Sequence, residues 1–316
     1  MNKNDWLEVC VKDLVMPSSV MIRILICLLA LYFGTELKGQ TTISDLFDSL
    51  QFSTESLMMD KDIVIRQKSM EDTKTLIDRI LDRDDSYEIG FDSIQRISVQ
   101  YPADSSFRIF TGQLFLSEDK YRYYGILQRR DNERHPIVLR DGSDVIRSPK
   151  EEQLTAENWY GAVYYNLKQF DHEGARYYLM FGYNAFSLYQ RQKLVEVLTF
   201  DDHGMPLFGA PVFEYPGHEG IHRFILQYSS DVGVGLNYDD ELQMIVFDHL
   251  IPMKSPYQAQ SVALVPDGSY CAFTFDGGKW KYVPKVFHEI LSEPPRDKPV
   301  FNEETKSKDI FGRKKN

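Results

Sequence analysis

The sequence predicts a mainly β protein: an antiparallel multi-stranded meander preceded by a short N-terminal α-helical segment. Aromatic residues make up 13% of the 316-residue chain, with 19 Tyr and 20 Phe, and aromatic side chains favour strands. Short apolar runs recur at spacings of about ten residues, separated by the Asp, Asn, Gly and Pro typical of turns. No long helical pattern interrupts these runs, which favours antiparallel pairing. A sandwich, a barrel-like meander and an irregular propeller all fit, while the lack of a fixed repeat argues against a regular propeller.

Composition and charge limit the class of protein. Hydrophobic content of 43% and charged content of 26% are ordinary for a soluble globular chain, and the length allows one large or two small domains. The formal net charge of −11 gives no support for nucleic-acid binding, which needs a basic face. We therefore expect no nucleic-acid partner.

The N-terminus has the parts of a secretory signal peptide at residues 21–39. A short basic start at Met21 precedes an apolar run, 24–34 (ILICLLALYFG), and a polar end before Gln40. A membrane-spanning helix needs about 20 apolar residues, so no stable transmembrane span is expected after cleavage. A buried core helix or an uncleaved anchor is the alternative. Residues 1–20 would make an unusual n-terminal region for a signal peptide, and we interpret them as an over-extended gene start.

Two amphipathic helices are expected in an N-terminal segment, residues 40–88. The first has apolar residues at helical spacing from Ile43 to Leu50, with Ser44 as its candidate N-cap, and the second covers residues 63–81. A β-domain is expected over residues 89–291. Residues 292–316 form a basic tail that is expected to be flexible, because it has little to bury.

Alternating and apolar runs define the strands of the β-domain. The expected strands before residue 201 are 94–101, 107–116, 121–128, 136–139, 159–167, 176–181 and 194–200. Hairpin turns are expected at 171–174, 201–204, 237–240 and 276–278, and a loop or short helical turn at 148–158. Cys271, the one cysteine left after cleavage, is expected to be a small buried strand residue and not a nucleophile.

One string matches a catalytic motif, His218-Glu219-Gly220-Ile221-His222. In zinc hydrolases of the H-E-x-x-H type, two histidines one helical turn apart bind zinc and the glutamate activates the bound water. Here Gly217 precedes the string, a glycine lies inside it and a strand-like run follows, so there is no room for a helix. We expect a hairpin loop, with no metal or cofactor. The alternative is a zinc-dependent hydrolase with Glu219 as catalytic residue and His218 and His222 as ligands.

Two further groups have both a structural and a functional interpretation. The turn carboxylates Asp201, Asp202, Asp239, Asp240 and Glu241 are expected to be exposed turn residues, with a calcium site as the alternative. The Tyr pairs 123–124, 164–165 and 177–178 place one ring on each face of a strand. They are expected to cover core edges, with a platform for sugar or protein ligands as the alternative.

Several short strings resemble those of a group of uncharacterised exported proteins of Bacteroidota. They are 131–142 (DNERHPIVLRDG), 198–201 (LTFD), 208–213 (FGAPVF), 247–252 (FDHLIP) and 265–270 (VPDGSY). The resemblance covers roughly residues 121–283. It implies export in a diderm bacterium, to the periplasm, the outer membrane or the medium, and carries over no activity or site residue.

These observations favour a non-enzymatic cell-envelope or secreted protein with a binding or structural role. Many aromatic strands are present without a convincing catalytic set, so the expected partner is an envelope protein or a glycan. The zinc-dependent hydrolase is the second hypothesis.

Overall fold

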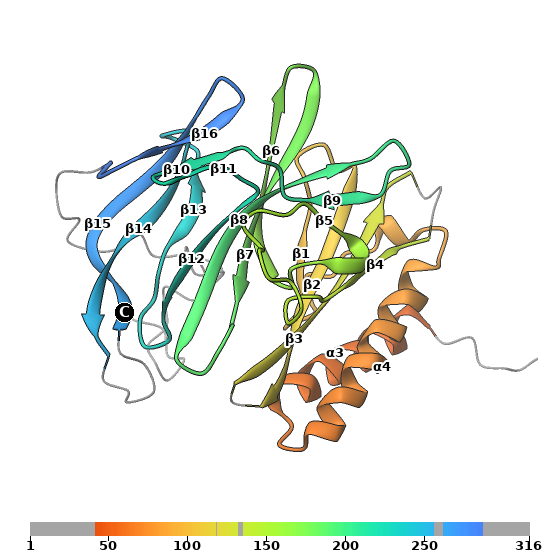
Figure 1. Cartoon of the computed structure of the whole chain (residues 1–316). Helices are drawn as coiled ribbons and strands as arrows, with labels where there is room; N and C mark the ends of the chain where they lie inside the picture. Colours follow the sequence, from red (N-terminus) through yellow and green to blue (C-terminus); the bar gives the residue numbers. More distant parts are fainter. Residues whose placement is uncertain (1–41, 118, 132–134, 256–261, 287–316) are drawn as a thin grey trace, which may run out of the picture. The chain divides into compact units, whose positions relative to one another are not determined.

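The computed structural model describes residues 42–117, 119–131, 135–255 and 262–286 (Figure 1). The predicted gene-start segment 1–20, signal peptide 21–39 and tail 292–316 therefore lie outside the described residues. The fold is mainly β and antiparallel, with a short N-terminal helical segment, as the sequence predicts. Within the described ranges, no helix is long and apolar enough to cross a membrane.

Helix α3 (Ile43–Met59) begins one residue before Ser44, its predicted N-cap. The backbone N–H of Asp45 donates to Thr42 Oγ1 (3.2 Å), and the Asp45 carboxylate accepts from the backbone N–H of Thr42 (3.0 Å). This reciprocal capping box makes Thr42 the cap, so the prediction of Ser44 is wrong. By internal contacts the chain divides into two units, the first ending at Leu46 and the second beginning at Phe47.

Helix α4 (Ile63–Leu81) matches the predicted range and contacts α3 through side chains. Asp62 caps its start by accepting from the N–H of Val64 (2.8 Å). Ser53 Oγ of α3 donates to the carbonyl of Ser69 (2.7 Å) and lies 2.9 Å from Thr73 Oγ1. Small hydroxyl side chains at this contact allow the two helices to approach each other while their polar groups stay paired.

The strands form three sheets. The first, in the order β1-β2-β3-β4, contains Ser98–Gln100, Phe107–Ser117, Lys120–Arg129 and Ile137–Arg140. The second, in the order β5-β9-β8-β7-β6, contains Leu154–Thr155, Pro206–Phe208, Gln190–Phe200, Ala175–Asn184 and Val163–His172, with β12 (Arg223–Ser229) paired to β8. The third, in the order β11-β10-β16-β15-β14-β13, contains His218–Ile221, Phe213–Tyr215, Lys279–Val283, Val262–Asp276, Met244–Lys254 and Leu236–Asp239. Two 3-10 turns, Ser86–Glu88 (η1) and Ala156–Asn158 (η2), lie in the connections.

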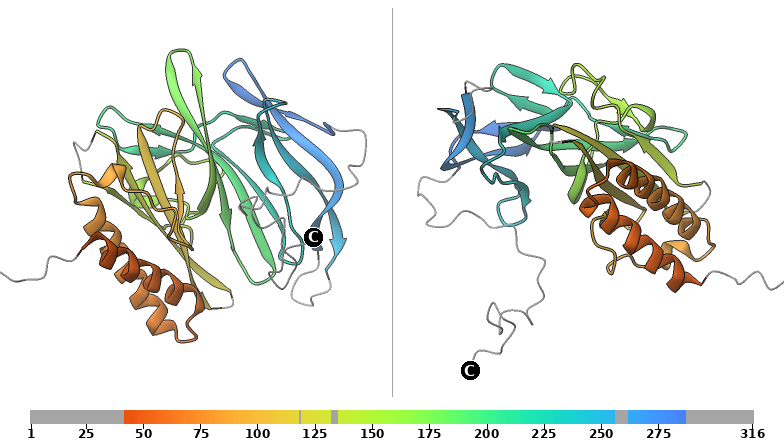
Figure 2. Two further views of the ribbon diagram at one scale, coloured as in Figure 1. Left: turned by 180° about the vertical axis from the view of Figure 1, so that it is seen from behind. Right: turned by 90° about the horizontal axis from the view of Figure 1, so that it is seen from below.

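The second sheet is buried on both faces, between the other two (Figure 2). Along β8, Leu194 and Leu198 face a core shared with the first sheet, while Val195 and Val197 face a core shared with the third. Because alternate strand residues point to opposite faces, a strand buried on both sides needs a continuous apolar run. Of the three architectures that fit the sequence, this stacking of sheets corresponds to the sandwich.

A fully buried arginine fastens the segment after α4 to the first sheet. Arg108 of β2 donates to the carbonyls of Ser86 and Ile89 (both 2.7 Å) and to Gln128 Oε1 (2.8 Å), and its guanidinium lies 5.0 Å from the ring centroid of Phe91. In the described part of the chain, all its hydrogen-bond partners are uncharged. Several hydrogen bonds and an aromatic face thus replace the water that the charge loses on burial.

Most predicted hairpins form, with adjusted bounds. The turns at 171–174, 201–204 and 276–278 join antiparallel strands as predicted, whereas the turn predicted at 237–240 follows β13, which continues to Asp239. The strand predicted over 94–101 is shorter, Ser98–Gln100, and the predicted loop at 148–158 holds β5 and η2. Cys271 is a buried strand residue, 1% exposed, as predicted. One ladder between named strands of the described chain is parallel, that of β10 with β16.

Candidate functional site

The H-E-x-x-H string does not form the helical turn that zinc chemistry requires. His218–Ile221 is strand β11, in which His218 pairs with Tyr215 of β10, so the predicted loop is instead a short edge strand. Residues four apart in a strand are separated by about 13 Å, against about 6 Å along a helix axis. His218 and Glu219 are exposed on this edge.

His222 lies beyond the strand in a different environment. Its backbone N–H donates to the carbonyl of Lys150 (2.7 Å), and its Nδ1 is buried with no hydrogen-bond partner in the described structure. Burial lowers its pKa below the usual histidine value, which favours the neutral ring. A catalytic zinc site also needs a third protein ligand. His249 bonds to Asp267 (2.9 Å), and Glu289 lies outside the described residues. The structure therefore does not assemble the string into a common site.

Asp201 and Asp239 accept hydrogen bonds from backbone N–H groups within their own turns. Asp201 accepts from the N–H groups of His203 and Met205 (both 2.8 Å), and Asp239 accepts from those of Glu241 and Leu242 (both 2.9 Å). Asp240 forms an ion pair with Lys168. Over the described ranges, no three His, Cys, Asp or Glu side chains gather in a way that could hold a metal ion.

The paired tyrosines belong to the cores and not to an exposed platform. Buried members are Tyr123, Tyr124, Tyr164 and Tyr178, and half-buried members are Tyr165 and Tyr177. None of the six rings is fully exposed, so the core-edge interpretation fits these pairs.

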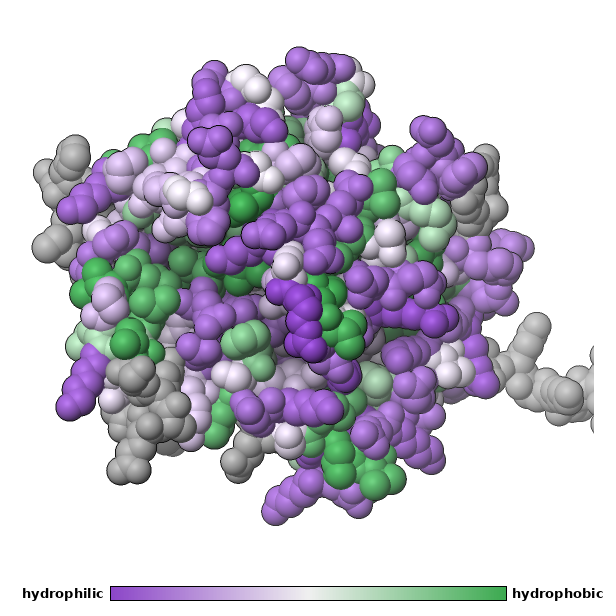
Figure 3. All heavy atoms as spheres, viewed as in Figure 1, coloured by the Kyte–Doolittle hydropathy of each residue, from purple (hydrophilic) through white to green (hydrophobic). Residues whose placement is uncertain are grey.

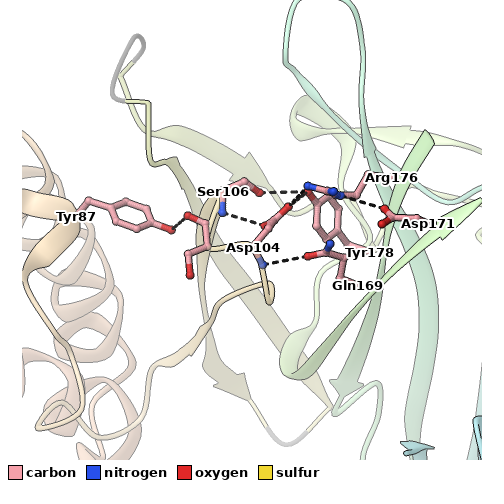
Figure 4. Close-up of polar contacts among 8 residues, drawn as sticks. Tyr87, Asp104, Ser106, Gln169, Asp171, Arg176 and Tyr178 are labelled. Carbon is pink, nitrogen blue, oxygen red and sulfur yellow. Dashed lines mark hydrogen bonds and ion pairs between the residues drawn. The ribbon is translucent and has the colours of Figure 1, made fainter. Parts of the chain in front are cut away.

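A polar cluster around Asp104 joins the β1–β2 loop to the β6–β7 hairpin (Figure 4). The Asp104 carboxylate accepts from Arg176 Nη1 (2.8 Å), from the Tyr178 hydroxyl (3.1 Å) and from the backbone N–H of Ser106 (3.0 Å). Burial raises the pKa of this carboxyl, but the hydrogen bonds from Ser106, Arg176 and Tyr178 outweigh burial and hold the pKa below its usual value. Because these groups bond to one another, the cluster is a structural junction.

A second polar network is sealed inside the first core. Trp159 Nε1 donates to the Tyr164 hydroxyl (2.8 Å), which donates to Glu196 Oε1 (2.5 Å), and Glu196 Oε2 accepts from Arg223 Nε (2.6 Å). Both charged side chains are 0% exposed. A ligand would have no access to this network, and its role is therefore in packing and register.

A surface groove with an exposed aromatic ring remains as the candidate site. It has a volume of about 210 Å³ and lies where the start of β3 meets the loop between β7 and β8, at the lower end of these strands in Figure 1. We call it the Phe186 groove. Its lining residues are Asp119, Lys120, Tyr121, Arg122, Tyr123, Ser143, Asp144, Tyr160, Asn184 and Phe186.

Phe186 has an unusual backbone conformation for a bulky residue. Its φ is +51°, in the left-handed region, and its side chain is 42% exposed. A non-glycine residue in such a conformation costs about 1–3 kcal/mol and persists only where its surroundings impose it. Such strain is concentrated at binding and active sites, so it identifies Phe186 as a candidate contact residue.

Hydrogen bonds on both sides of Phe186 hold the loop in place. The Phe186 N–H donates to Asn184 Oδ1 (2.7 Å), and the Ala185 N–H donates to the Tyr123 hydroxyl (2.7 Å). Arg191 Nη1 donates to the carbonyls of Ala185 and Ser187. The ring is therefore presented from a fixed loop while making no contact with another ring of the described chain.

Four charged residues line the groove together with Phe186, and two of them form an ion pair. Arg122 and Asp144 form an ion pair at 2.5 Å, and the hydrogen bond from Arg122 holds the pKa of the Asp144 carboxyl below its usual value. Asp119 accepts from the N–H of Leu188 (2.8 Å), which ties the β2–β3 hairpin to the Phe186 loop. In the described structure the Lys120 ammonium makes no hydrogen bond.

A larger hollow, about 520 Å³, lies between α3 and α4. Its lining residues are Asp48, Ser49, Phe52, Ser53, Ser69, Asp72, Thr75, Leu76 and Arg79. All of them have helical backbone, so this is the ordinary groove of a helix pair. None of the residues that line the α3–α4 hollow has the left-handed backbone found at Phe186.

Most of the surface in view is hydrophilic, and hydrophobic side chains gather near the α3–α4 connection and along β14 and β15 (Figure 3).

No protein-family model, curated protein or solved structure matches this chain. The candidate site consequently rests on the geometry described above.

Sequence reasoning missed the Phe186 groove because its parts are far apart in the chain. Tyr121 and Arg122 are predicted only as part of the strand 121–128, and no sequence pattern places Asp144 beside them. The segment from Asn184 to Tyr189, between two strand-like runs, predicts a connection but carries no sign that Phe186 is left-handed, since Gly or Asn is usual there.

Proposed function

We propose that the chain is a non-enzymatic binding protein, exported to the cell envelope or secreted, which holds its partner in the Phe186 groove. The observation that carries this proposal is the exposed Phe186 ring on a left-handed backbone, held by Asn184, Tyr123 and Arg191. A rigid, exposed aromatic side chain is the kind of residue that dominates binding energy at recognition surfaces.

The chemistry of the groove supports binding over catalysis. No histidine or cysteine lines its described part, and Asp141 Oδ1 accepts from both the hydroxyl (2.6 Å) and the backbone N–H (3.0 Å) of Ser143, which is the pattern of a local turn. The zinc-dependent hydrolase stays a separate hypothesis that no observation here favours, because its residues lie on an edge strand and around it. Export is supported by the signal-peptide pattern at residues 21–39.

A retention experiment tests the proposal with two matched phenylalanine variants. The full chain is expressed with its own N-terminus, purified after export and immobilised, and N-terminal sequencing checks cleavage before Gln40. Envelope extract of a diderm bacterium is passed over wild type, Phe186→Asn and Phe52→Ala. Asn tolerates the left-handed backbone, and Phe52 is an exposed ring on α3, 73% exposed, outside the groove.

We expect the wild type and Phe52→Ala to retain the same material, and Phe186→Asn to lose about tenfold or more of the affinity. Circular dichroism establishes that all three proteins are folded. Equal retention by Phe186→Asn and wild type would reject the groove as the binding surface.

A further inference from the structure

The lining of the Phe186 groove distinguishes between classes of partner. Of its ten residues, four are aromatic and six are polar, and none is aliphatic. Sites that take an apolar anchor from a protein or a drug-like molecule are lined mainly by hydrophobic side chains. A sugar ring has different needs, because one face carries C–H groups and the edge carries hydroxyls that both donate and accept. The groove offers both kinds of surface, an open aromatic ring and a polar rim.

The charges in the groove favour a neutral ligand. Among the described lining residues, Lys120 and Arg122 are balanced by Asp119 and Asp144, so these side chains together carry no net charge to attract an anion or a cation. Arg122 and Asp144 neutralise each other directly at 2.5 Å. A charged ligand would have to compete with that pair.

Hydrogen-bonding capacity in the rim is unused. In the described structure Arg122 makes one hydrogen bond, through Nη2, out of the five donors of a guanidinium. Over the same residues the Lys120 ammonium and the Tyr121 hydroxyl make none. Sugar hydroxyls are suited to such mixed donors and acceptors, and the remaining guanidinium donors of Arg122 and the carboxylate oxygens of Asp144 can bond neighbouring hydroxyls.

The size of the groove limits the contact to one ring. Its volume of about 210 Å³ is below the roughly 300–1,000 Å³ of sites that enclose a whole small ligand. We infer that the Phe186 groove binds neutral oligosaccharide, with one sugar ring against Phe186 and its hydroxyls on Arg122 and Asp144. The inference rests on the proposed function and specifies its ligand class.

The two carboxylates of the groove, Asp119 and Asp144, both accept hydrogen bonds in the described structure. Glycoside hydrolysis needs a carboxylic acid whose pKa is raised so that it can protonate the leaving oxygen. The hydrogen bond from Arg122 instead holds the pKa of Asp144 below its usual value, so this carboxyl is ionised near neutral pH. The other groove carboxylate, Asp119, accepts from the backbone N–H of Leu188 (2.8 Å), and we expect the groove to hold a sugar without cleaving it.

Calorimetric titration with defined oligosaccharides provides the first test. The probes are neutral gluco-, manno-, galacto- and xylo-oligosaccharides, with uronate oligomers for comparison. We expect the wild type and Phe52→Ala to bind at least one neutral series, with little dependence on salt. Affinity should fall about tenfold or more in Phe186→Asn and also fall in Arg122→Gln, which keeps a planar donor but loses the charge. Binding of uronates alone, or of no saccharide, would overturn the inference.

Treatment of the retained envelope material separates this inference from the proposed function. Material held through Phe186 that survives protease but is lost after periodate oxidation of its sugars supports the saccharide. Material that is lost after protease and survives periodate leaves the binding function standing and refutes the saccharide. If no material depends on Phe186, both proposals fail.

Discussion

Replacing Arg223 by Met should strongly destabilise the protein, because it leaves a carboxylate buried without its charged partner. Arg223 and Glu196 are both 0% exposed, and they face each other across β12 and β8. Arg223 also donates to the carbonyls of Pro149 and Phe208, so its removal unpairs three acceptors. Breaking a buried pair from one side typically costs about 3–5 kcal/mol. Since whole domains are stable by about 5–15 kcal/mol, this variant should be close to unfolding.

Neutralising both partners together should cost much less than the two single changes. Glu196→Gln keeps an oxygen that can accept from the Tyr164 hydroxyl, and Met fills the volume of the arginine stem. The double variant then has unpaired neutral groups only, which cost about 1–3 kcal/mol each at most. We expect a coupling energy of about 3 kcal/mol between the two positions, at the upper end for residues in direct contact.

Urea unfolding at pH 7, followed by circular dichroism, measures the four free energies of this cycle. The matched control is the exposed pair Arg140 and Glu157, 3.0 Å apart with side chains 71% and 70% exposed, where neither single change should exceed about 1 kcal/mol. Single changes at Arg223 and Glu196 that are equally small and additive would refute the reasoning, because they would mean that water reaches the pair.

Three further predictions concern other parts of the molecule. Gly112→Ala should lower the free energy of unfolding, measured in urea, by about 1–3 kcal/mol, because a Cβ at this position would lie 2.2 Å from Tyr124 Cζ. The control is Gly233→Ala, which should be neutral because no atom lies within 4 Å of its added Cβ. Equal effects of the two changes would contradict this description of the packing. The pKa of Asp104 is lowered in the folded state, so its stabilising contribution is complete above the unfolded pKa of about 3.9 and is lost as pH falls through the folded pKa. Stability of Asp104→Asn should therefore depend less on pH below about pH 4 than that of wild type, and parallel curves would reject this role. Elemental analysis of the chain purified without chelators should find no stoichiometric zinc, because His218 lies on a strand and not on a helix. The opposite result, about one zinc per chain that is lost in His218→Ala, would support the hydrolase hypothesis.

Local features were predictable because their causes are local. The range of α4 follows from its apolar spacing and polar end, and the hairpins at 171–174 and 276–278 follow from turn residues between two apolar runs. The N-cap of α3 was misplaced because two hydroxyl residues lie close together, and only the reciprocal contact of Thr42 with Asp45 distinguishes them.

Pairing between distant strands could not be predicted in the same way. No turn connects β12 to β8 or β10 to β16, so their registers depend on side chains that meet only in the fold. The Phe186 groove has the same origin, since it combines the start of β3, the segment after β4 and the β7–β8 loop. The alternation of polar and apolar residues predicts which face of a strand a residue lies on, but it does not predict which strand pairs with that strand.

The buried ion pair supplies register information that apolar side chains alone would not. Seven consecutive residues of β12 pair with β8, and Arg223 lies opposite Glu196 in that register. A slip of one residue would turn Arg223 to the opposite face and place it opposite Val195 or Val197, leaving two buried charges unpaired. That error would cost several kcal/mol, whereas a slip among apolar residues of similar size would cost little. The doubly neutral variant should therefore lose specificity of pairing before it loses stability, and hydrogen exchange in β12 should rise while the unfolding midpoint changes less.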